Sequence, residues 1–529
     1  MIGSRTIAAV AASGMTAALL CVALNAGAAG KTLRYASQFD PGTMDPHALA
    51  SVYNNRVMSQ IYEPLVGRDE KFELEPRLAL SWTPLEGGKG WRLKLRPNVK
   101  FHDGSPFSAD DVVFNVARAM HPLSAHKSTL PNVTGARKVD DLTVDLLTTE
   151  ATPVLPLALF NLRLISKAWA VKNRVENPQD YKGKEEVYST RNANGTGPYK
   201  LVKWEPDSQV TLAAFDGYYG KRGNVTTATY FTVSSAATRV AALLSGEMDL
   251  VIDPAVQDLD RLRNSPAVKI EQAMGLGEQF LGFDYKNDKL LHGDAGGKNP
   301  FRDPRVRQAV SLAIDKNALV AKVMRNTGST GKSLFTPAVD GYDKRFDGAT
   351  PYDPARAKAL LKEAGYPNGF SVVLDCSTQQ PADSIGQAIT GMLSRVGIRV
   401  DYRPLPFNIL LPKLNKGDTS LYVIGWSPAT AEPEGVLVPL AHARNANGAG
   451  EYNFGSYANP KVDALIDQGR VEFDAAKRKA LFTEAMAAID ADAGFIPLVS
   501  RNVTWAMRKN VKAALRPTDN LDLRFVNVD

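Results

Sequence analysis

The stretch LYVIGWSPATAEPEG, residues 421–435, gives the clearest sign of both fold and site in this chain. A short apolar run ends at Trp426, and small polar residues and two prolines follow it. This pattern predicts a buried strand with a loop at its carboxyl end. Ligands of open α/β sheets collect beyond the carboxyl ends of the strands, so Trp426, Thr430 and Glu432 form a candidate ligand floor. The alternative is a core tryptophan followed by an ordinary surface loop.

The segments around this stretch alternate between strand and helix patterns. FSVVLD (370–375) and IRVDYRPL (398–405) predict strands, and residues 385–396 and 409–414 predict the intervening helices. Such alternation indicates a parallel sheet with crossover helices. A second unit of this kind contains the strands TLRYA (32–36), GPYKLVKW (197–204), SQVTLAAF (208–215) and DLVID (249–253) and a helix at 236–244. Because both units present small polar loops at their strand ends, we expect two lobes that face a cleft.

A third block, beginning near residue 90, has a different sequence pattern. GWRLKL (90–95) alternates apolar and basic residues, which is the period of a half-buried strand. Ser108 and Asp111 predict a capping box, and the helix that follows is expected to bury Val113, Val116, Ala117 and Met120. This block is predicted to be α+β and antiparallel. Near the chain end, FIPLVS (495–500) and VTWAMR (503–508) predict two further strands.

Composition and charge favour a folded globular protein. The chain has 529 residues, of which 44% are apolar and 22% charged, with a formal net charge of +7. Basic and acidic residues are interleaved, so we expect a solvated, mildly basic surface and no nucleic-acid binding.

The first 28 residues predict a cleaved secretory signal peptide. One arginine precedes an uncharged apolar stretch, and Ala-Gly-Ala at 26–28 provides a small-residue cleavage site. An uncleaved anchor is the alternative. After cleavage only Cys376 remains, so the mature chain, starting near residue 29, cannot form an internal disulfide.

No motif in the chain predicts catalysis. NTGSTGKS (326–333) has Asn where a phosphate-binding loop needs its first glycine, and it follows a helix rather than a strand. The six histidines lack the spacing of a metal site. Glu432 and Glu434 flank a proline and are expected to face differently, and Cys376 has no histidine near it in sequence. We therefore expect a protein that is not an enzyme and that carries no cofactor and no metal.

Several segments in order resemble an extracytoplasmic solute-binding protein of family 5, the oligopeptide/dipeptide/nickel type that serves ABC importers. The matching segments are IYEPLVGRD (61–69), LALSW (78–82), WRLKLRPNVKFHDGSPFSADDVVF (91–114), GTGPYKLVKW (195–204), RVAALLSGEMDLV (239–251) and NPFRDPRVRQAVSLAIDKNAL (299–319). The resemblance covers essentially the whole mature chain.

This resemblance implies the type II periplasmic binding protein fold, with two α/β lobes hinged by crossing strands around a cleft and an extra α+β domain. Lobe I would comprise residues 29–65, 191–272 and 503–529, the extra domain 66–190, and lobe II 273–502. The expected function is a periplasmic receptor that closes on a peptide-like or other small organic solute and delivers it to an inner-membrane ABC permease. We expect a monomer. The alternative is an exported ligand-sensing or chaperone-like protein that presents its solute to a membrane sensor.

The same resemblance implies a site without its usual charges. Dipeptide binders of the family have an Asp shortly after the Gly-Trp pair and an Arg after the first strand of lobe II, whereas this chain has SPATA (427–431) and QQP (379–381) there. A buried ammonium or carboxylate without a charged partner costs several kcal/mol, so a zwitterionic dipeptide fits poorly unless Glu432 or a displaced Arg substitutes. The candidate ligand-binding residues are Gln38, Phe39, Gln379, Gln380, Trp426, Thr430, Glu432, Tyr452 and Asn453.

Overall fold

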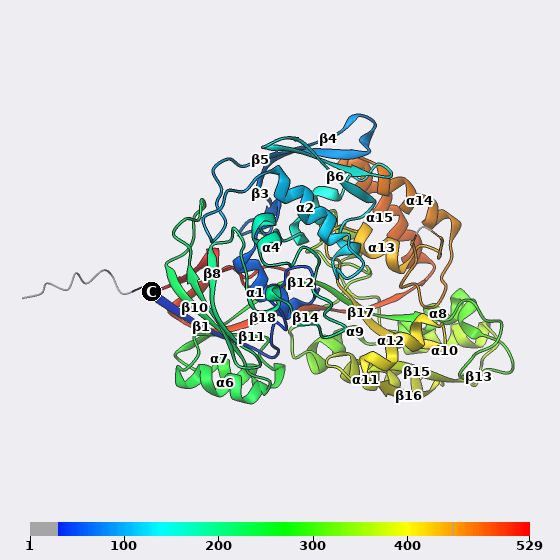
Figure 1. The fold of residues 1–529 in the computed structure, drawn as a ribbon. Helices are drawn as coiled ribbons and strands as arrows, with labels where there is room; N and C mark the ends of the chain where they lie inside the picture. Colours follow the sequence, from blue (N-terminus) through cyan, green and yellow to red (C-terminus); the bar gives the residue numbers. More distant parts are fainter. Residues whose placement is uncertain (1–29, 447) are drawn as a thin grey trace, which may run out of the picture.

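The computed structural model describes residues 30–446 and 448–529. The expected signal peptide at residues 1–28 lies outside the described residues. Most strands of the chain join one twelve-stranded sheet with the main order β13-β15-β17-β12-β18-β11-β1-β10-β9-β8, to which β14 and β16 add at β18 and β15. This sheet runs through the whole lower half of the molecule in the view of Figure 1.

One half of the sheet forms lobe I. Its central strand β1 (Lys31–Ser37) runs parallel to both β10 and β11. Helix α1 (Val52–Ile61) begins at the N-cap Ser51 and buries Val57 and Ile61 against this half of the sheet. The other elements of this lobe are β8 (Tyr199–Glu205), β9 (Gln209–Ala214), β10 (Val225–Thr232), β11 (Leu250–Ile252), α6 (Ala236–Ser245), α7 (Leu259–Arg263), β19 (Val511–Ala513) and β20 (Val526–Val528).

The other half of the sheet forms lobe II. Strand β15 (Ser371–Ser377) is parallel to β16 (Arg399–Leu405) and β17 (Leu421–Trp426), which is the parallel arrangement expected from the sequence. Helices α8 (Pro304–Ala313) and α10 (Pro354–Glu363) begin at aspartate N-caps with proline in the first turn. The remaining elements are α9 (Lys316–Ala318), α11 (Ala382–Ser394), α12 (Phe407–Asn415), α13 (Glu434–Leu440), α14 (Pro460–Val471), α15 (Ala475–Ala491), β13 (Gly293–Asp294) and β14 (Gly328–Ser329).

Two long antiparallel strands connect the lobes. β12 (Val268–Phe283) has 16 residues and β18 (Ile496–Arg508) has 13, and they pair along most of their length. The expectation of two separate C-terminal strands is wrong, because β18 continues through Arg501 and Asn502. The pairing is interrupted between Met274 and Glu278, where three residues of β12 lie opposite one residue of β18.

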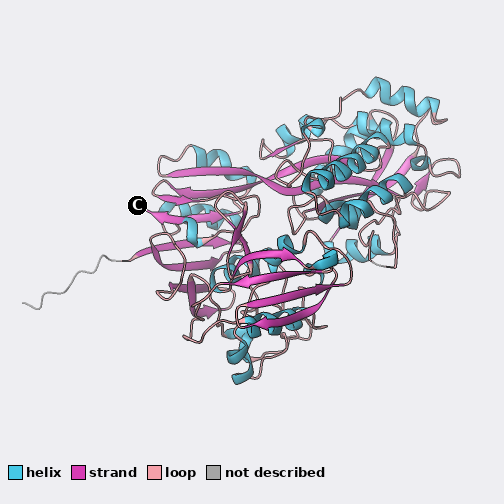
Figure 2. Cartoon of the chain, turned by 90° about the horizontal axis from the view of Figure 1, so that it is seen from above, coloured by secondary structure: helices cyan, strands magenta, loops and turns pink. Residues whose placement is uncertain are grey.

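The extra domain is built on a separate four-stranded sheet, seen in the lower middle of Figure 2. All its pairs are antiparallel, in the order β4-β5-β7-β6. Helix α2 (Ala109–Ala119) packs on β6 and β7 and begins with the expected capping box of Ser108 and Asp111. The remaining elements of this block are β2 (Val66–Arg68), β3 (Leu74–Pro76), β4 (Ala79–Pro84), β5 (Gly90–Leu95), β6 (Val133–Asp140), β7 (Thr143–Thr148), α3 (Leu155–Ala158), α4 (Lys167–Lys172) and α5 (Tyr188–Arg191).

The buried face of α2 differs from the expected one. Ala117 is exposed and Val113 is only half-buried, whereas Val112 and Val116 are fully buried. The helix is rotated about its axis relative to the expected orientation, because two polar side chains also point into the core. Asn115 donates to the carbonyl of Ile165 (2.7 Å), and Arg118 forms a buried ion pair with Asp45.

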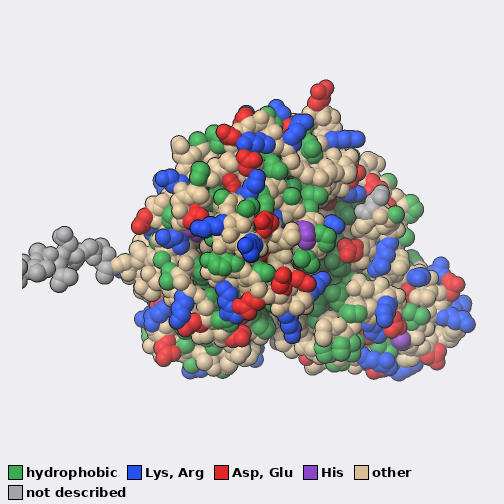
Figure 3. All heavy atoms as spheres, viewed as in Figure 1, with side chains coloured by type: hydrophobic (Ala, Val, Ile, Leu, Met, Phe, Trp, Pro, Cys, Tyr) green, Lys and Arg blue, Asp and Glu red, His purple; other side chains and the backbone are tan. Residues whose placement is uncertain are grey.

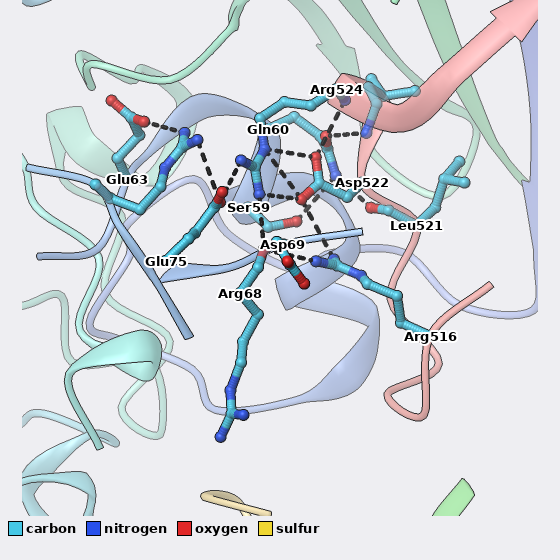
Figure 4. Close-up of polar contacts among 12 residues, drawn as sticks. Ser59, Gln60, Glu63, Arg68, Asp69, Glu75, Arg516, Leu521, Asp522 and Arg524 are labelled. Atoms are coloured by element: carbon cyan, nitrogen blue, oxygen red, sulfur yellow. Dashed lines mark hydrogen bonds and ion pairs between the residues drawn. The ribbon is translucent and has the colours of Figure 1, made fainter. Parts of the chain in front are cut away.

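A buried polar network attaches the β2–β3 hairpin to lobe I and to the last residues of the chain (Figure 4). Arg524 binds Glu75 (2.5 Å) and Asp522 (2.7 Å), and Arg516 also pairs with Asp522. Gln60 of α1 donates to the carbonyl of Leu521 (2.6 Å). Because these charges are paired and bonded, their burial is compatible with a stable fold. These contacts thus join the N-terminal and C-terminal parts of the chain into one packed unit.

Candidate functional site

The carboxyl ends of the parallel strands of both lobes point at the same segment of the two connecting strands. In lobe I, β11 ends at Ile252, which pairs with Trp505 of β18. In lobe II, β17 ends at Trp426, which pairs with Glu278 of β12, and Glu278 lies opposite Ser500. Residues 500–504 of β18 therefore lie between the two sets of strand ends. This is where open α/β sheets bind ligands.

The lobe I side of this segment is built around a buried guanidinium. Arg56, whose side chain is 1% exposed, binds Asp253 (3.1 Å) and Asp519 (2.6 Å) and contacts the hydroxyl of Ser37. Both carboxylates are only partly buried, and Trp505 donates its indole N–H to Asp519 (3.0 Å). Burial raises the pKa of Asp253, and the charge of Arg56 opposes this. The strand ends of lobe I thus present carboxylates that Arg56 fixes in place.

Phe39 and Gln38 follow β1 as the sequence predicts. The Phe39 ring is 48% exposed and packs edge to face on Tyr53 of α1, with 4.6 Å between ring centroids. Tyr230 anchors the turn by donating to the carbonyl of Phe39 (2.5 Å). Gln38 is half-buried. An aromatic ring held in an exposed position offers an apolar wall to a ligand.

Trp426 ends β17 as expected, and it is half-buried. Its indole N–H donates to the carbonyl of Gly435 (2.8 Å), and its ring packs on Tyr452, with 4.8 Å between ring centroids. Trp426 and Tyr452 are therefore brought together, although they are far apart in the sequence. The loop after Trp426 is shorter than expected because α13 begins at Glu434.

Thr430 and Glu432 lie where the extra domain meets lobe II. Arg68 of β2 donates to the carbonyl of Thr430 (3.0 Å) and pairs with Asp340 (3.4 Å). Figure 4 shows the Arg68 side chain extending away from the buried network that holds its backbone. Glu432 is 7% exposed and faces Arg478 of α15 (3.6 Å). This part of the predicted floor is thus a contact surface for Arg68.

Two adjoining cavities lie beside this contact. Glu432 lines the smaller one, of about 350 Å³, with Asp340, Gly341, Pro433 and the first turns of α15. The larger, of about 560 Å³, reaches Met274 of β12. Glu434 faces a different cation from Glu432, namely Arg470 (3.8 Å), and burial raises its pKa to about 7. The two glutamates therefore do not form an acid/base pair.

The last three candidates differ in their surroundings. Gln379 and Gln380 are exposed beyond the end of β15, and Gln380 bonds to Asp383 (3.3 Å) and Ser384 (2.7 Å). Asn453 is fully buried. Its amide donates to the carbonyls of His442 (3.0 Å) and Tyr457 (2.7 Å) and accepts from the backbone of Tyr457 (2.9 Å). In this conformation Asn453 holds its own loop.

One residue of the site was missed by the sequence analysis. Arg501 lies in the middle of β18, at the segment toward which both sets of strands point. It lies between the two strands that the sequence predicts at residues 495–500 and 503–508. The alternation of Val503 and Trp505, extended back by one step, would have indicated its face.

In residues 30–446 and 448–529, no group of three or more His, Cys, Asp or Glu side chains could hold a metal ion. No helix in these described ranges is long and apolar enough to cross a membrane. Basic and acidic side chains are interspersed over the face shown in Figure 3, and the surface is notched between the lower parts of the two lobes.

Comparison with known proteins decides the family. The sequence model of the bacterial extracellular solute-binding proteins, family 5, matches residues 73–448. The chain belongs to family 5 of the bacterial extracellular solute-binding proteins. Members of this family bind solutes, and the two-lobed α/β fold with crossing strands is the one expected from the sequence.

Curated relatives and solved structures agree with this assignment. The chain is 28% identical to heme-binding protein A of Haemophilus influenzae over 85% of this chain and 83% of the relative. It is 28% identical to the dipeptide-binding protein of Escherichia coli over 93% and 94% of the two chains. The structure of HbpA2 from Haemophilus parasuis shares the fold, with a TM-score of 0.82 at 24% identity, covering 94% of this chain and all of that one (100%).

Proposed function

We propose that this family 5 protein is the periplasmic receptor of an ABC importer, which captures a peptide-like or other small organic solute between its lobes. The mature chain would start near residue 29. Lobe I would comprise residues 29–65, 191–272 and 503–529, the extra domain 66–190, and lobe II 273–502. The receptor would act as a monomer on an inner-membrane permease.

A single observation carries the proposal. Both lobes share one sheet, and among residues 30–446 and 448–529 only β12 and β18 run from one lobe into the other within it. Two strands with an irregular segment in the middle can bend without breaking the cores on either side, because each lobe has its own apolar clusters. Bending there would open and close the space between the strand ends, as hinge closure requires.

The chemistry of the walls supports a small organic solute. Phe39, Trp426 and Tyr452 supply apolar surface, and Gln38, Gln379 and Gln380 supply amide groups that can donate and accept hydrogen bonds. Relatives are named for heme, dipeptide and glutathione binding, so members with comparable sequences take chemically different solutes. The side chains at 379–381 and 427–431 supply no charge in this chain. This supports a solute other than a free zwitterionic dipeptide.

Analysis of the solute retained by the protein tests this function. Mature protein, purified gently from the periplasm of its own cells, is denatured and the released small molecules are identified by mass spectrometry. A stoichiometric organic solute that raises the melting temperature when added back to emptied protein is expected. Absence of a retained solute, together with no thermal shift across a panel of peptides and organic acids, would refute the receptor role.

A further inference from the structure

Arg501 occupies an unusual position in the two connecting strands. It is the residue of β18 that faces the irregular segment of β12, where Gly275, Leu276 and Gly277 replace regular pairing. On its other side it pairs with Gly328 of β14. A Cβ at Gly328 would lie 2.6 Å from the carbonyl of Ser500, so a glycine is needed for this close approach. Arg501 thus projects from the junction of three strands.

The side chain of Arg501 points to the face that carries Phe39 and Tyr53. Successive side chains of a strand alternate between faces, so Arg501 shares a face with Val503 and Trp505. Trp505 on this face bonds to Asp519. Asp519 also binds Arg56, whose guanidinium lies over the Tyr53 ring, 5.0 Å from its centroid. Arg501 therefore projects from the same face of the sheet as the aromatic wall of lobe I.

The charged side chains near Arg501 are already paired with one another. Asp519 binds Arg56 (2.6 Å), and Asp253 is shared by Arg56 (3.1 Å) and Arg239 (3.2 Å). Two carboxylates therefore meet two guanidiniums. Arg501 is exposed, and within residues 30–446 and 448–529 its side chain has no hydrogen-bond or ion-pair partner. One positive charge remains uncompensated at the point where both lobes present their strand ends.

We propose that Arg501 binds a carboxylate of the solute from the base of the space between the lobes, with Phe39 and Tyr53 contacting the solute's apolar part. The solute class is an organic acid or a peptide acid without a free ammonium group. This rests on the receptor function proposed above and specifies its ligand. A guanidinium presents a planar fork of donors that matches a carboxylate bidentately, and closure of the lobes strengthens such a bond by excluding water.

Three peptides with the same two residues and different terminal charges test the proposal. N-acetyl-Ala-Phe carries a carboxylate alone, Ala-Phe-amide an ammonium alone, and N-acetyl-Ala-Phe-amide neither. Affinities are measured by isothermal titration at low salt for the mature wild-type protein and for Arg501→Gln, Arg501→Lys and Arg508→Gln. Arg508 is the matched control, because it lies at the other end of the same strand, close to Gly246 in lobe I.

We expect wild type to prefer the acid over the neutral peptide by about 10- to 100-fold, the range for a charge-assisted hydrogen bond. Arg501→Gln should abolish this preference, Arg501→Lys should keep part of it because the fork is lost but not the charge, and Arg508→Gln should keep all of it. Circular dichroism should show equal folding, since Arg501 is exposed.

Three results would overturn the proposal: a preference of wild type for the ammonium or neutral peptide, a full preference for the acid in Arg501→Gln, or no binding of any of the three. The receptor function is judged separately by the retained solute. A retained solute without an acidic group would leave the protein a receptor and remove the role proposed for Arg501.

Discussion

Replacing Arg68 with Ala should shift the protein towards an open form. Arg68 links a fixed region to a movable one. Its carbonyl accepts hydrogen bonds from Arg516 (3.3 Å) and Arg524 (3.1 Å) on the lobe I side, while its side chain donates to the carbonyl of Thr430 (3.0 Å) in lobe II. The guanidinium also donates to the carbonyl of Phe72 (2.9 Å) and stacks on its ring (4.7 Å) within the same hairpin. Opening of the lobes breaks the contacts with Thr430 and Asp340 and leaves those with Phe72 in place.

The magnitude follows from the contacts that differ between the two forms. A hydrogen bond from a charged donor contributes about 1.5–3 kcal/mol, which corresponds to roughly a 10- to 150-fold change in the ratio of closed to open protein. The ion pair with Asp340 adds little, about 0–1 kcal/mol, because the Asp340 side chain is 54% exposed. The hydrogen bonds of the Arg68 backbone stay in place in the alanine variant.

Small-angle X-ray scattering and titration with the retained solute measure the effect. Arg68→Ala should increase the radius of gyration of solute-free protein and weaken solute binding by the same factor, since closure and binding are linked. Asp340→Asn is the control and should change affinity by less than about fivefold. If Arg68→Ala left both quantities unchanged, or if Asp340→Asn had an equal effect, the assignment of Arg68 as a closing contact would fail.

Three further predictions concern the wall, the buried charges and the close approach at β14. Trp426→Ala should weaken solute binding by about 1–3 kcal/mol by calorimetry; unchanged affinity with a lower melting temperature would assign the indole to the core alone. Burial raises the pKa of Glu278, bonded to Ser500, to about 8, so the folded protein holds a proton that the unfolded chain loses near pH 4.5. Stability should therefore fall as the pH rises from about 5 to 8, and Glu278→Gln should flatten this slope in thermal melts; an unchanged slope contradicts the assignment. Burial lowers the pKa of Lys316 to about 8, so its contribution has the opposite sign and acts above pH 8, where stability should rise again. Gly328→Val would meet the carbonyl of Ser500 at 2.6 Å and should reduce the free energy of unfolding by about 1–3 kcal/mol in denaturant titrations. Gly391→Ala is the control and should not reduce it, because Gly391 lies in helix α11 with open space around it, where alanine is favoured over glycine.

Local signals predicted the secondary structure well. Ser108 and Asp111 mark a helix start through hydrogen bonds to nearby backbone groups, and the structure shows this capping box. The parallel arrangement of β15, β16 and β17 followed from strand and helix alternation. The face of α2 could not be predicted in this way, because Arg118 and Asn115 point inward only when Asp45 and Ile165 arrive from distant parts of the chain.

In the candidate site, too, local sequence patterns predict where residues lie along a strand but not which distant residues they meet. Phe39 and Trp426 follow their strands, as the position of strand ends predicts. The amide side chain of Asn453 makes it a candidate from the sequence, and the structure uses that amide to hold a loop. The alternation along β18 indicates the face of Arg501 but not its position, which comes from the meeting of β12, β14 and β18, remote from one another in sequence.

Lobe I contains both β1 and α1 from the start of the described chain and residues 503–529 from its end, and this has a consequence for biosynthesis. β1 pairs with β10, about two hundred residues later, and α1 is held by Asp519 and Leu521 near the C-terminus. Lobe I therefore cannot be completed while the last segment is still being made. A growing chain therefore stays short of its native state until these residues have been synthesised. Removal of the final ten residues should prevent lobe I from assembling, although these residues lie at the end of the chain.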